Sequence, residues 1–94
     1  MDEPERDTIR LSVPADDAMR PVVEAAVGVL ARRCGLGDEA VRAARTASGD
    51  ALAELSGARG EREGALVRIE IRAMRGQLAV HLSGLHDERS LLLP

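Results

Sequence analysis

The sequence predicts an α+β domain, a two-layer sandwich in which two helices pack on one face of a short antiparallel sheet. Three segments, within residues 9–13, 67–71 and 78–82, alternate apolar and polar residues as half-buried strands do. Two longer segments between the first and second of these repeat apolar residues at helical spacing. The predicted order is therefore β-α-α-β-β. Because each strand has a single apolar face, both helices should cover that face.

The first strand carries Ile9, Leu11 and Val13 on one side and is closed by Pro14. An apolar stripe at helical spacing follows, made of Met19, Val22, Val23, Ala26, Val27 and Leu30. Either aspartate of the pair at 16–17 can cap the start of this helix. Gly35 is a natural C-cap for its end. The stripe, with a cap at each end, predicts the first helix.

A second helix is predicted after Gly37, with Asp38 as its N-cap. Its core-facing positions are mostly small: Val41, Ala44, Ala47 or Ser48, Ala51, Leu52 and Leu55. Small side chains predict that this helix approaches its neighbours closely. Gly49 lies in the middle of the helix, where glycine costs about 1 kcal/mol relative to alanine.

A polar, glycine-rich loop at 56–64 leads into the last two strands. Arg75-Gly76 between these strands predicts a tight hairpin in which the glycine supplies a positive φ.

We expect a flexible N-terminal tail at 1–7, one domain at 8–84 and a C-terminal tail at 85–94. The second tail ends in three leucines, which should dock on the domain or on a second copy. The charged face of the sheet is open to water or serves as an interface, and it carries Arg10, Ser12, Arg68, Glu70, Arg72 and His81.

Composition narrows the function classes. The chain has 94 residues, enough for one domain, and its core contains no Phe, Tyr or Trp. The net charge is −3, and no basic patch or stacking aromatic suggests a nucleic-acid partner. No apolar run approaches the ~20 residues of a membrane span, and the acidic N-terminus is unlike a signal peptide. The single cysteine, Cys34, cannot form an internal disulfide. We therefore expect a cytoplasmic protein.

The segment TIRLSVPA, followed by a helix of the type MRPVVEAAVGVLARR and the same element order, resembles the anti-sigma-factor serine kinases. These belong to the histidine-kinase-like ATPase (GHKL) superfamily. In that family the second helix carries a Glu and, four residues later, an Asn that holds Mg²⁺ against the ATP phosphates. An Asp-x-Gly-x-Gly motif after the hairpin reads the adenine, and a lid completes the pocket. The resemblance covers residues 8–84 and implies a truncated, degenerate member.

On that pattern, TASGDALAEL places Asp50 at the family's Glu and Glu54 at its Asn. The spacing puts both side chains on one helical face, but the chain contains no Asn at all. Ser83 or Asp87 stands where the adenine motif begins, and of its glycines only Gly84 remains. The chain ends before a lid.

These positions have simpler interpretations. Asp50 and Glu54 form either a relic or working cation site or a solvated acidic face neutralised by arginines, for which the candidates are Arg42, Arg45 and Arg59. His81 and His86 could join Asp87 and Glu88 at a metal, but their spacing is unfamiliar, and surface histidines are the simpler interpretation. Ser48 and Ser83 lack a Ser/His/Asp arrangement. Cys34 is a small apolar residue at a helix end. We therefore predict no catalytic residue and no metal site.

The sequence thus predicts a non-catalytic, protein-binding regulator with no cofactor, acting in sigma-factor partner switching. Its partner would be a sigma factor, an anti-sigma antagonist or a kinase paralogue. The alternatives are a reduced Mg-ATP-binding kinase activity through Asp50 and Glu54, or an unrelated oligomerisation module. A homodimer is also expected, because the core is small and the C-terminus apolar. The candidate interface residues are Arg10, Arg68, Arg72, His81, Leu91, Leu92 and Leu93.

Overall fold

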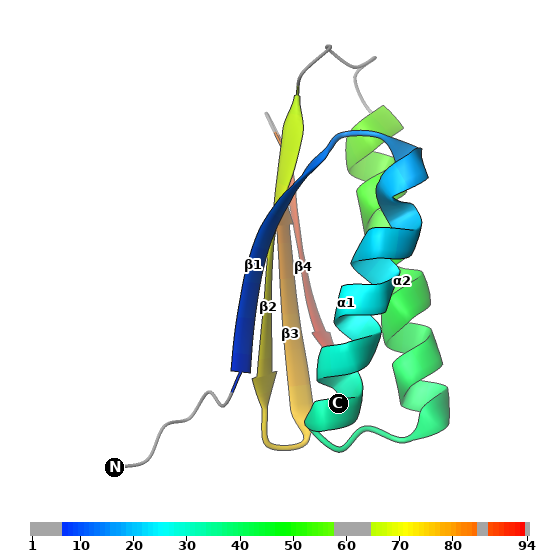
Figure 1. Cartoon of the computed structure of the whole chain (residues 1–94), viewed down its shortest axis with the longest axis vertical. Coiled ribbons are helices and arrows are strands. Elements are labelled where there is room, and N and C mark those ends of the chain that lie inside the picture. The colour runs from blue at the N-terminus through cyan, green and yellow to red at the C-terminus, as the bar shows by residue number, and fades with distance from the viewer. Residues whose placement is uncertain (1–6, 58–64, 85–86, 94) are drawn as a thin grey trace.

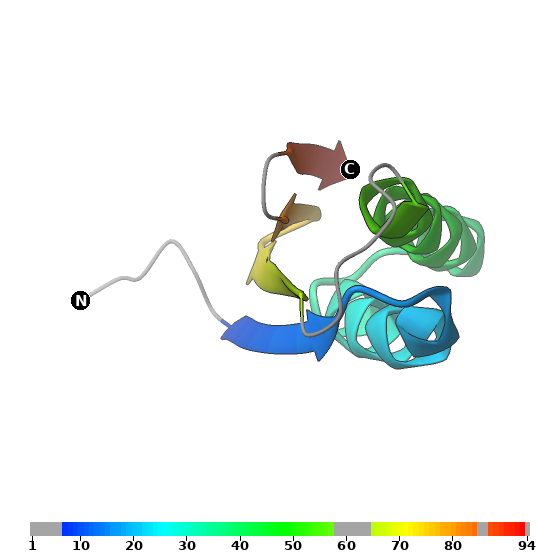
Figure 2. The ribbon, with the colours of Figure 1, turned by 90° about the horizontal axis from the view of Figure 1, so that it is seen from above.

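The computed structural model of the chain describes residues 7–57, 65–84 and 87–93. Its elements are β1 (Asp7–Pro14), a 3-10 turn (Asp17–Met19), α1 (Arg20–Arg33), α2 (Asp38–Gly57), β2 (Leu66–Met74), β3 (Gln77–Ser83) and β4 (Glu88–Leu93). The four strands form one antiparallel sheet in the order β1-β2-β3-β4. Both helices lie on the same face of that sheet (Figures 1 and 2). The predicted α+β sandwich is confirmed.

The sheet differs from the prediction by one strand. Residues 88–93 belong to the segment expected as a C-terminal tail, and they form β4 alongside β3. Leu91 lies opposite Val80 and Leu93 opposite Leu78, so both pack against the core. Three consecutive leucines hide this alternation in the sequence, because Leu92 is as apolar as its neighbours but points to the other face. Leu91 and Leu93 thus dock on the domain, which was one of the two expected arrangements, whereas Leu92 does not.

The inner face of the sheet and the two helices enclose an aliphatic core. The buried apolar residues are Val13, Val23, Val27, Leu30, Ala31, Val41, Ala44, Ala51, Leu52, Val67, Ile69, Ile71, Ala73, Leu78, Val80 and Leu82. Along β2 and β3 burial alternates with every residue, as the sequence predicted. This alternation leaves a second, polar face of the sheet on the side away from the helices.

The two ends of α1 have the capping residues that the sequence predicted. The Asp16 carboxylate accepts a hydrogen bond from the backbone N–H of Ala18, at 2.9 Å, and so caps the 3-10 turn that leads into α1. Gly35, just beyond its end, adopts a φ of 91°. The hairpin between β2 and β3 has Gly76 at a φ of 71°, as predicted, and its N–H donates to the Cys34 carbonyl. The hairpin is therefore tied to the end of α1.

The two helices approach each other across two glycines. A side-chain Cβ on Gly28 of α1 would lie 3.1 Å from Cδ of Arg45, and one on Gly49 of α2 would lie 2.5 Å from Nε of Arg20. Each helix thus has a glycine beneath an arginine of the other. Glu24 lies between the two arginines, 2.8 Å from Nε of Arg20 and 4.0 Å from Nη2 of Arg45. The expected close approach of the second helix is explained by this arrangement.

None of the helices within the described residues is long and apolar enough to cross a membrane.

Candidate functional site

The polar face of the sheet, which we call the outer sheet face, collects side chains from all four strands. Its residues are Thr8, Arg10, Ser12, Arg68, Glu70, Arg72, Ala79, His81, Ser83, Glu88, Ser90 and Leu92. Strand register arranges them in rows that run across the sheet. The central row is Arg10, Glu70, His81 and Ser90. The structure therefore brings together the four predicted interface residues Arg10, Arg68, Arg72 and His81.

Arg10 and Glu70 pair across β1 and β2, with Nη2 of the arginine 3.1 Å from Oε2 of the glutamate. The arginine side chain is 75% exposed, so water screens this pair and its contribution to stability is small. Arg68 and Arg72 flank Glu70 on the same strand and face. The outer sheet face carries three arginines against two glutamates, on a chain whose net charge is −3. It is thus the more basic side of an acidic protein.

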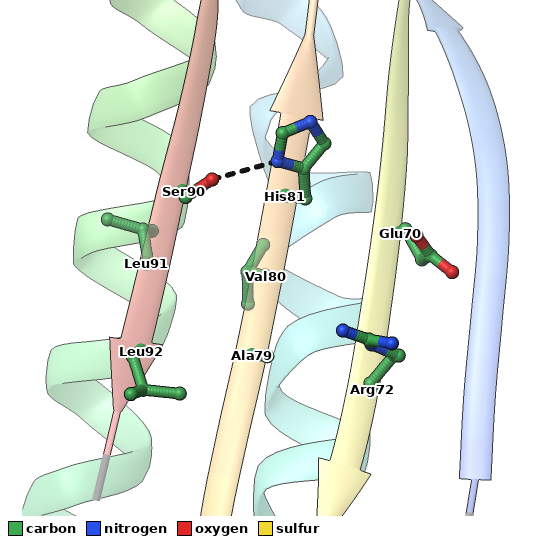
Figure 3. Close-up of a pocket in the computed structure, with 8 residues that line it drawn as sticks. All are labelled: Glu70, Arg72, Ala79, Val80, His81, Ser90, Leu91 and Leu92. Carbon is green, nitrogen blue, oxygen red and sulfur yellow. Dashed lines mark hydrogen bonds between the residues drawn. The ribbon is translucent and has the colours of Figure 1, made fainter. Parts of the chain in front are cut away.

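His81 joins β3 to β4 through two contacts, of which Figure 3 shows the one with Ser90. Its Nδ1 lies 2.8 Å from Oγ of Ser90, and its Nε2 lies 3.0 Å from Oε1 of Glu88. The order serine, imidazole, carboxylate is that of a catalytic triad. All three side chains are solvent-accessible, however, and the glutamate is 67% exposed, whereas triad carboxylates work from buried positions. We interpret the group as a hydrogen-bonded link between two strands.

Ser90 was missed as a partner of His81 because β4 was not predicted, and Glu88 was considered beside His81 only as a possible metal ligand. In the structure Glu88 and Ser90 share the face of Leu92, but the run of three leucines hides this alternation in the sequence. Two open hollows lie on this face and share Glu70 and His81. One, of about 320 Å³, lies over β2, β3 and β4, and the other, of about 490 Å³, over β1, β2 and β3.

The acidic pair singled out by the resemblance lies on α2, in the helical layer. Nη2 of Arg20, from α1, is 2.7 Å from Oδ1 of Asp50. Nε of Arg89, from β4, is 2.9 Å from Oε1 of Glu54. Both acids are therefore paired with arginines, Arg20 and Arg89, that the sequence analysis did not name.

The arginines proposed as partners lie elsewhere. Arg45 faces Glu24, at 4.0 Å, and Arg42 has no ion pair with either acid within the described residues. Arg59 lies outside the described residues, as does His86. Side-chain hydrogen bonds to Glu24 and then Asp50 raise the pKa of Arg20.

The positions taken from the resemblance do not converge on one surface. Gly84, at the end of β3, lies against Leu55 of α2, and its N–H donates to the carbonyl of Asp87 at 2.8 Å. Gly84 therefore lies beside α2, at the residue that follows Glu54. Ser83, its neighbour in sequence, is on the outer sheet face opposite Glu88. The sheet therefore separates Ser83 from the two helical acids.

Within residues 7–57, 65–84 and 87–93, no three His, Cys, Asp or Glu side chains are grouped so that they could hold a metal ion. Cys34 is half-buried at the end of α1, and its Sγ lies 3.4 Å from the carbonyl oxygen of Ala31. Burial raises the pKa of this thiol above its ordinary value. Since the thiolate is the nucleophile, the position suppresses reactivity.

The predicted leucine patch is divided between the two faces of β4. Leu91 and Leu93 point inward and pack against the core, and Leu92 is 65% exposed on the outer sheet face. Leu92 is the most exposed of the large apolar residues in the described chain. Comparisons with protein-family models and with curated proteins find no match for the chain.

Proposed function

We propose that the chain is a non-catalytic, protein-binding regulator of the cytoplasm, resembling a degenerate anti-sigma-factor kinase and acting in sigma-factor partner switching. The observation that carries the proposal is that both acids on α2 are ion-paired with arginines. Asp50 and Glu54, at the positions of the family's Glu and Asn, are each paired with an arginine from another element, Arg20 and Arg89. One oxygen of each carboxylate is therefore already engaged by a guanidinium group, which would compete with Mg²⁺ for it.

The chemistry of the acids also argues against nucleotide chemistry. A carboxylate at position 54 can ligate Mg²⁺, which prefers oxygen ligands, but it adds negative charge beside the phosphates. The family's amide holds the metal without that charge. In this chain, pairing with Arg89 uses Glu54 to hold β4 against α2. A structural role for these residues leaves regulation by binding as the function that the site supports best.

The outer sheet face is the surface we propose for the protein partner. It is exposed, spans all four strands and presents Arg10, Arg68 and Arg72 around the hollows described above. Arginine is enriched at protein interfaces because its planar fork donates several hydrogen bonds and its stem packs on apolar surface. A sigma factor, an anti-sigma antagonist or a kinase paralogue with an acidic docking segment would fit this face.

Calorimetric titration with Mg-ATP tests the first part of the proposal. We expect no saturable binding to the wild-type chain. The double variant Arg20→Ala, Arg89→Ala removes both guanidinium groups and serves as the matched control. Micromolar affinity of the wild type that is lost in Asp50→Ala or Glu54→Ala would overturn the proposal in favour of a reduced ATP-binding activity.

A capture experiment with the tagged chain in its native organism tests the second part. We expect a sigma factor, an antagonist or a kinase paralogue to be retained by the wild type and lost with Arg68→Glu, Arg72→Glu. Arg42→Glu, an equal charge change at an exposed position of α2, should retain it. Capture that is unaffected by the sheet substitutions would refute the assigned surface. Recovery of the chain alone would favour an oligomerisation module.

A further inference from the structure

The sheet has two outer strands, β1 and β4, and within the described residues neither has a strand on its far side. An outer strand leaves alternate backbone N–H and C=O groups unpaired, which makes it a template for another strand. Proteins usually protect such edges with charged side chains or proline. The two edges of this sheet differ in these features.

β1 has the protective features. Arg10 lies near its middle with a largely exposed side chain, and Pro14, which has no N–H to donate, ends it. If two β1 strands paired about Arg10, the two arginines would face each other. This edge is therefore poorly suited to self-association.

β4 lacks these features over most of its length. Its two charged residues are at its start, and both are already paired within the chain, Glu88 with His81 and Arg89 with Glu54. The remaining residues, 90–93, are uncharged. Leu92 is 65% exposed, and Leu91 and Leu93 are only partly buried at the margin of the core. This edge combines unpaired backbone with uncovered leucine side chains.

We propose that β4 pairs antiparallel with β4 of a second copy across a two-fold axis, which joins the two sheets into one of eight strands. In antiparallel pairing, residues directly opposite each other point to the same face. The axis then passes through a single position. A centre at Leu91 or Leu92 sets leucines against uncharged residues or against the stem of Arg89, whereas a centre at Ser90 sets Leu92 against the charged Glu88. A centre at Arg89 would oppose like charges and is disfavoured.

The second copy is the occupant that best fits this edge. In a two-fold pairing the uncharged residues 90–93 of one β4 lie against the uncharged residues of the other. The pairing also satisfies backbone groups on both strands at once. The interface consists of one short strand pair and a few leucines, which falls at the small end of specific interfaces. We therefore expect a weak dimer whose population depends on concentration. This proposal is independent of the regulatory function proposed above.

Cysteine cross-linking tests the pairing and its register. Ser90→Cys, Leu91→Cys and Leu92→Cys are each made in a Cys34→Ser background, so that each chain has one thiol. Paired Cα atoms in antiparallel strands lie about 4.5–5.5 Å apart, within the range that a disulfide spans. The residue on the two-fold axis should cross-link to its own copy far faster than the other two. Val29→Cys, exposed on α1, is the control. Cross-linking at all three β4 positions no faster than at the control would overturn the proposal.

Sedimentation velocity over a concentration series gives an independent readout. We expect the wild type to dimerise as concentration rises towards about 1 mM, and Leu92→Arg to remain monomeric with an unchanged circular dichroism spectrum. Leu66→Arg changes an exposed apolar residue of β2 in the same way and should still dimerise. A wild type that stays monomeric throughout, or a dimer that persists in Leu92→Arg, would refute pairing through β4.

Discussion

The side chain of Arg20 lies directly over Gly49, so that a Cβ on the glycine would come within 2.5 Å of the arginine Nε. The same guanidinium contacts Glu24 on its own helix and Asp50 on α2. The absence of a side chain at Gly49, in the middle of α2, thus leaves room for the Arg20 side chain to reach α2. The low helix propensity of glycine is the energetic cost of this contact.

We expect Gly49→Ala to raise the free energy of unfolding by less than alanine normally does in a helix interior. Alanine in a helix interior normally stabilises by about 1 kcal/mol relative to glycine, but here the methyl group would displace both Arg20 and Glu24, because a carboxylate oxygen of Glu24 also lies 2.5 Å from where the Cβ would stand. Urea unfolding followed by circular dichroism measures the change. In an Arg20→Ala, Glu24→Ala background the same substitution should give the full gain. Equal gains in the wild type and in this background would contradict the packing.

Ser48→Ala should stabilise the protein by about 1 kcal/mol. Ser48 is fully buried in α2, and its hydroxyl has no hydrogen-bond partner within the described residues. Alanine removes the unsatisfied group and is the better helix former. For a domain of this size the gain corresponds to a rise in melting temperature of about 4–8 °C. Thr46→Ala, at an exposed position of the same helix, controls for propensity alone. A loss of stability in Ser48→Ala would mean that the hydroxyl is bonded.

The Cys34 thiol should make stability fall in alkaline solution. Burial raises its pKa in the folded protein, whereas the unfolded chain ionises at the ordinary value. The unfolded state therefore loses its proton first, and stability that is complete below about pH 9 declines as the pH rises above it. Unfolding measured from about pH 7 to about pH 10 in the wild type and in Cys34→Ala tests this. The alkaline decline should be smaller in the variant, and equal declines would refute the assignment to this thiol.

Gly76→Ala should destabilise the protein by about 1 kcal/mol. Gly76 has a φ of 71° in the two-residue turn between β2 and β3, a conformation that a Cβ makes costly. Gly76→Asn should cost less, because asparagine tolerates this region. Gly37→Ala is the control, since a Cβ there meets nothing within 4 Å and the φ is not positive. Equal effects at the two glycines would exclude backbone conformation as the cause.

Most of the fold could be predicted because its elements carry local signals. Alternation in β1, β2 and β3, the apolar stripe of α1 and the turn at Gly76 are each readable from a few neighbouring residues. β4 could not be predicted in the same way, because the run Leu91, Leu92 and Leu93 hides which residue faces the core. Its position beside β3 depends on contacts with α2 and on the pairing of Arg89.

The candidate site was less predictable, because its contacts join residues that are distant in sequence. The charged side of the sheet followed from alternation, and Arg10, Arg68, Arg72 and His81 lie there as expected. The partners of Asp50 and Glu54 lie 30 and 35 residues away along the chain. Sequence spacing offers only neighbours on the same helix or in the next loop, and so it selected other arginines.

The register of β1 has a consequence for how the chain is made. Its sole strand partner in the sheet described above is β2, and Pro14 pairs with Leu66 across the whole helical hairpin. β2 meets β3, and β3 meets β4, after a short connection. β1 therefore leaves the ribosome first but must wait for two helices to be synthesised before its partner emerges. Closing that long loop is the slow step expected of non-local strand pairing. Until β2 has been synthesised, the nascent chain carries β1 as an unpaired strand.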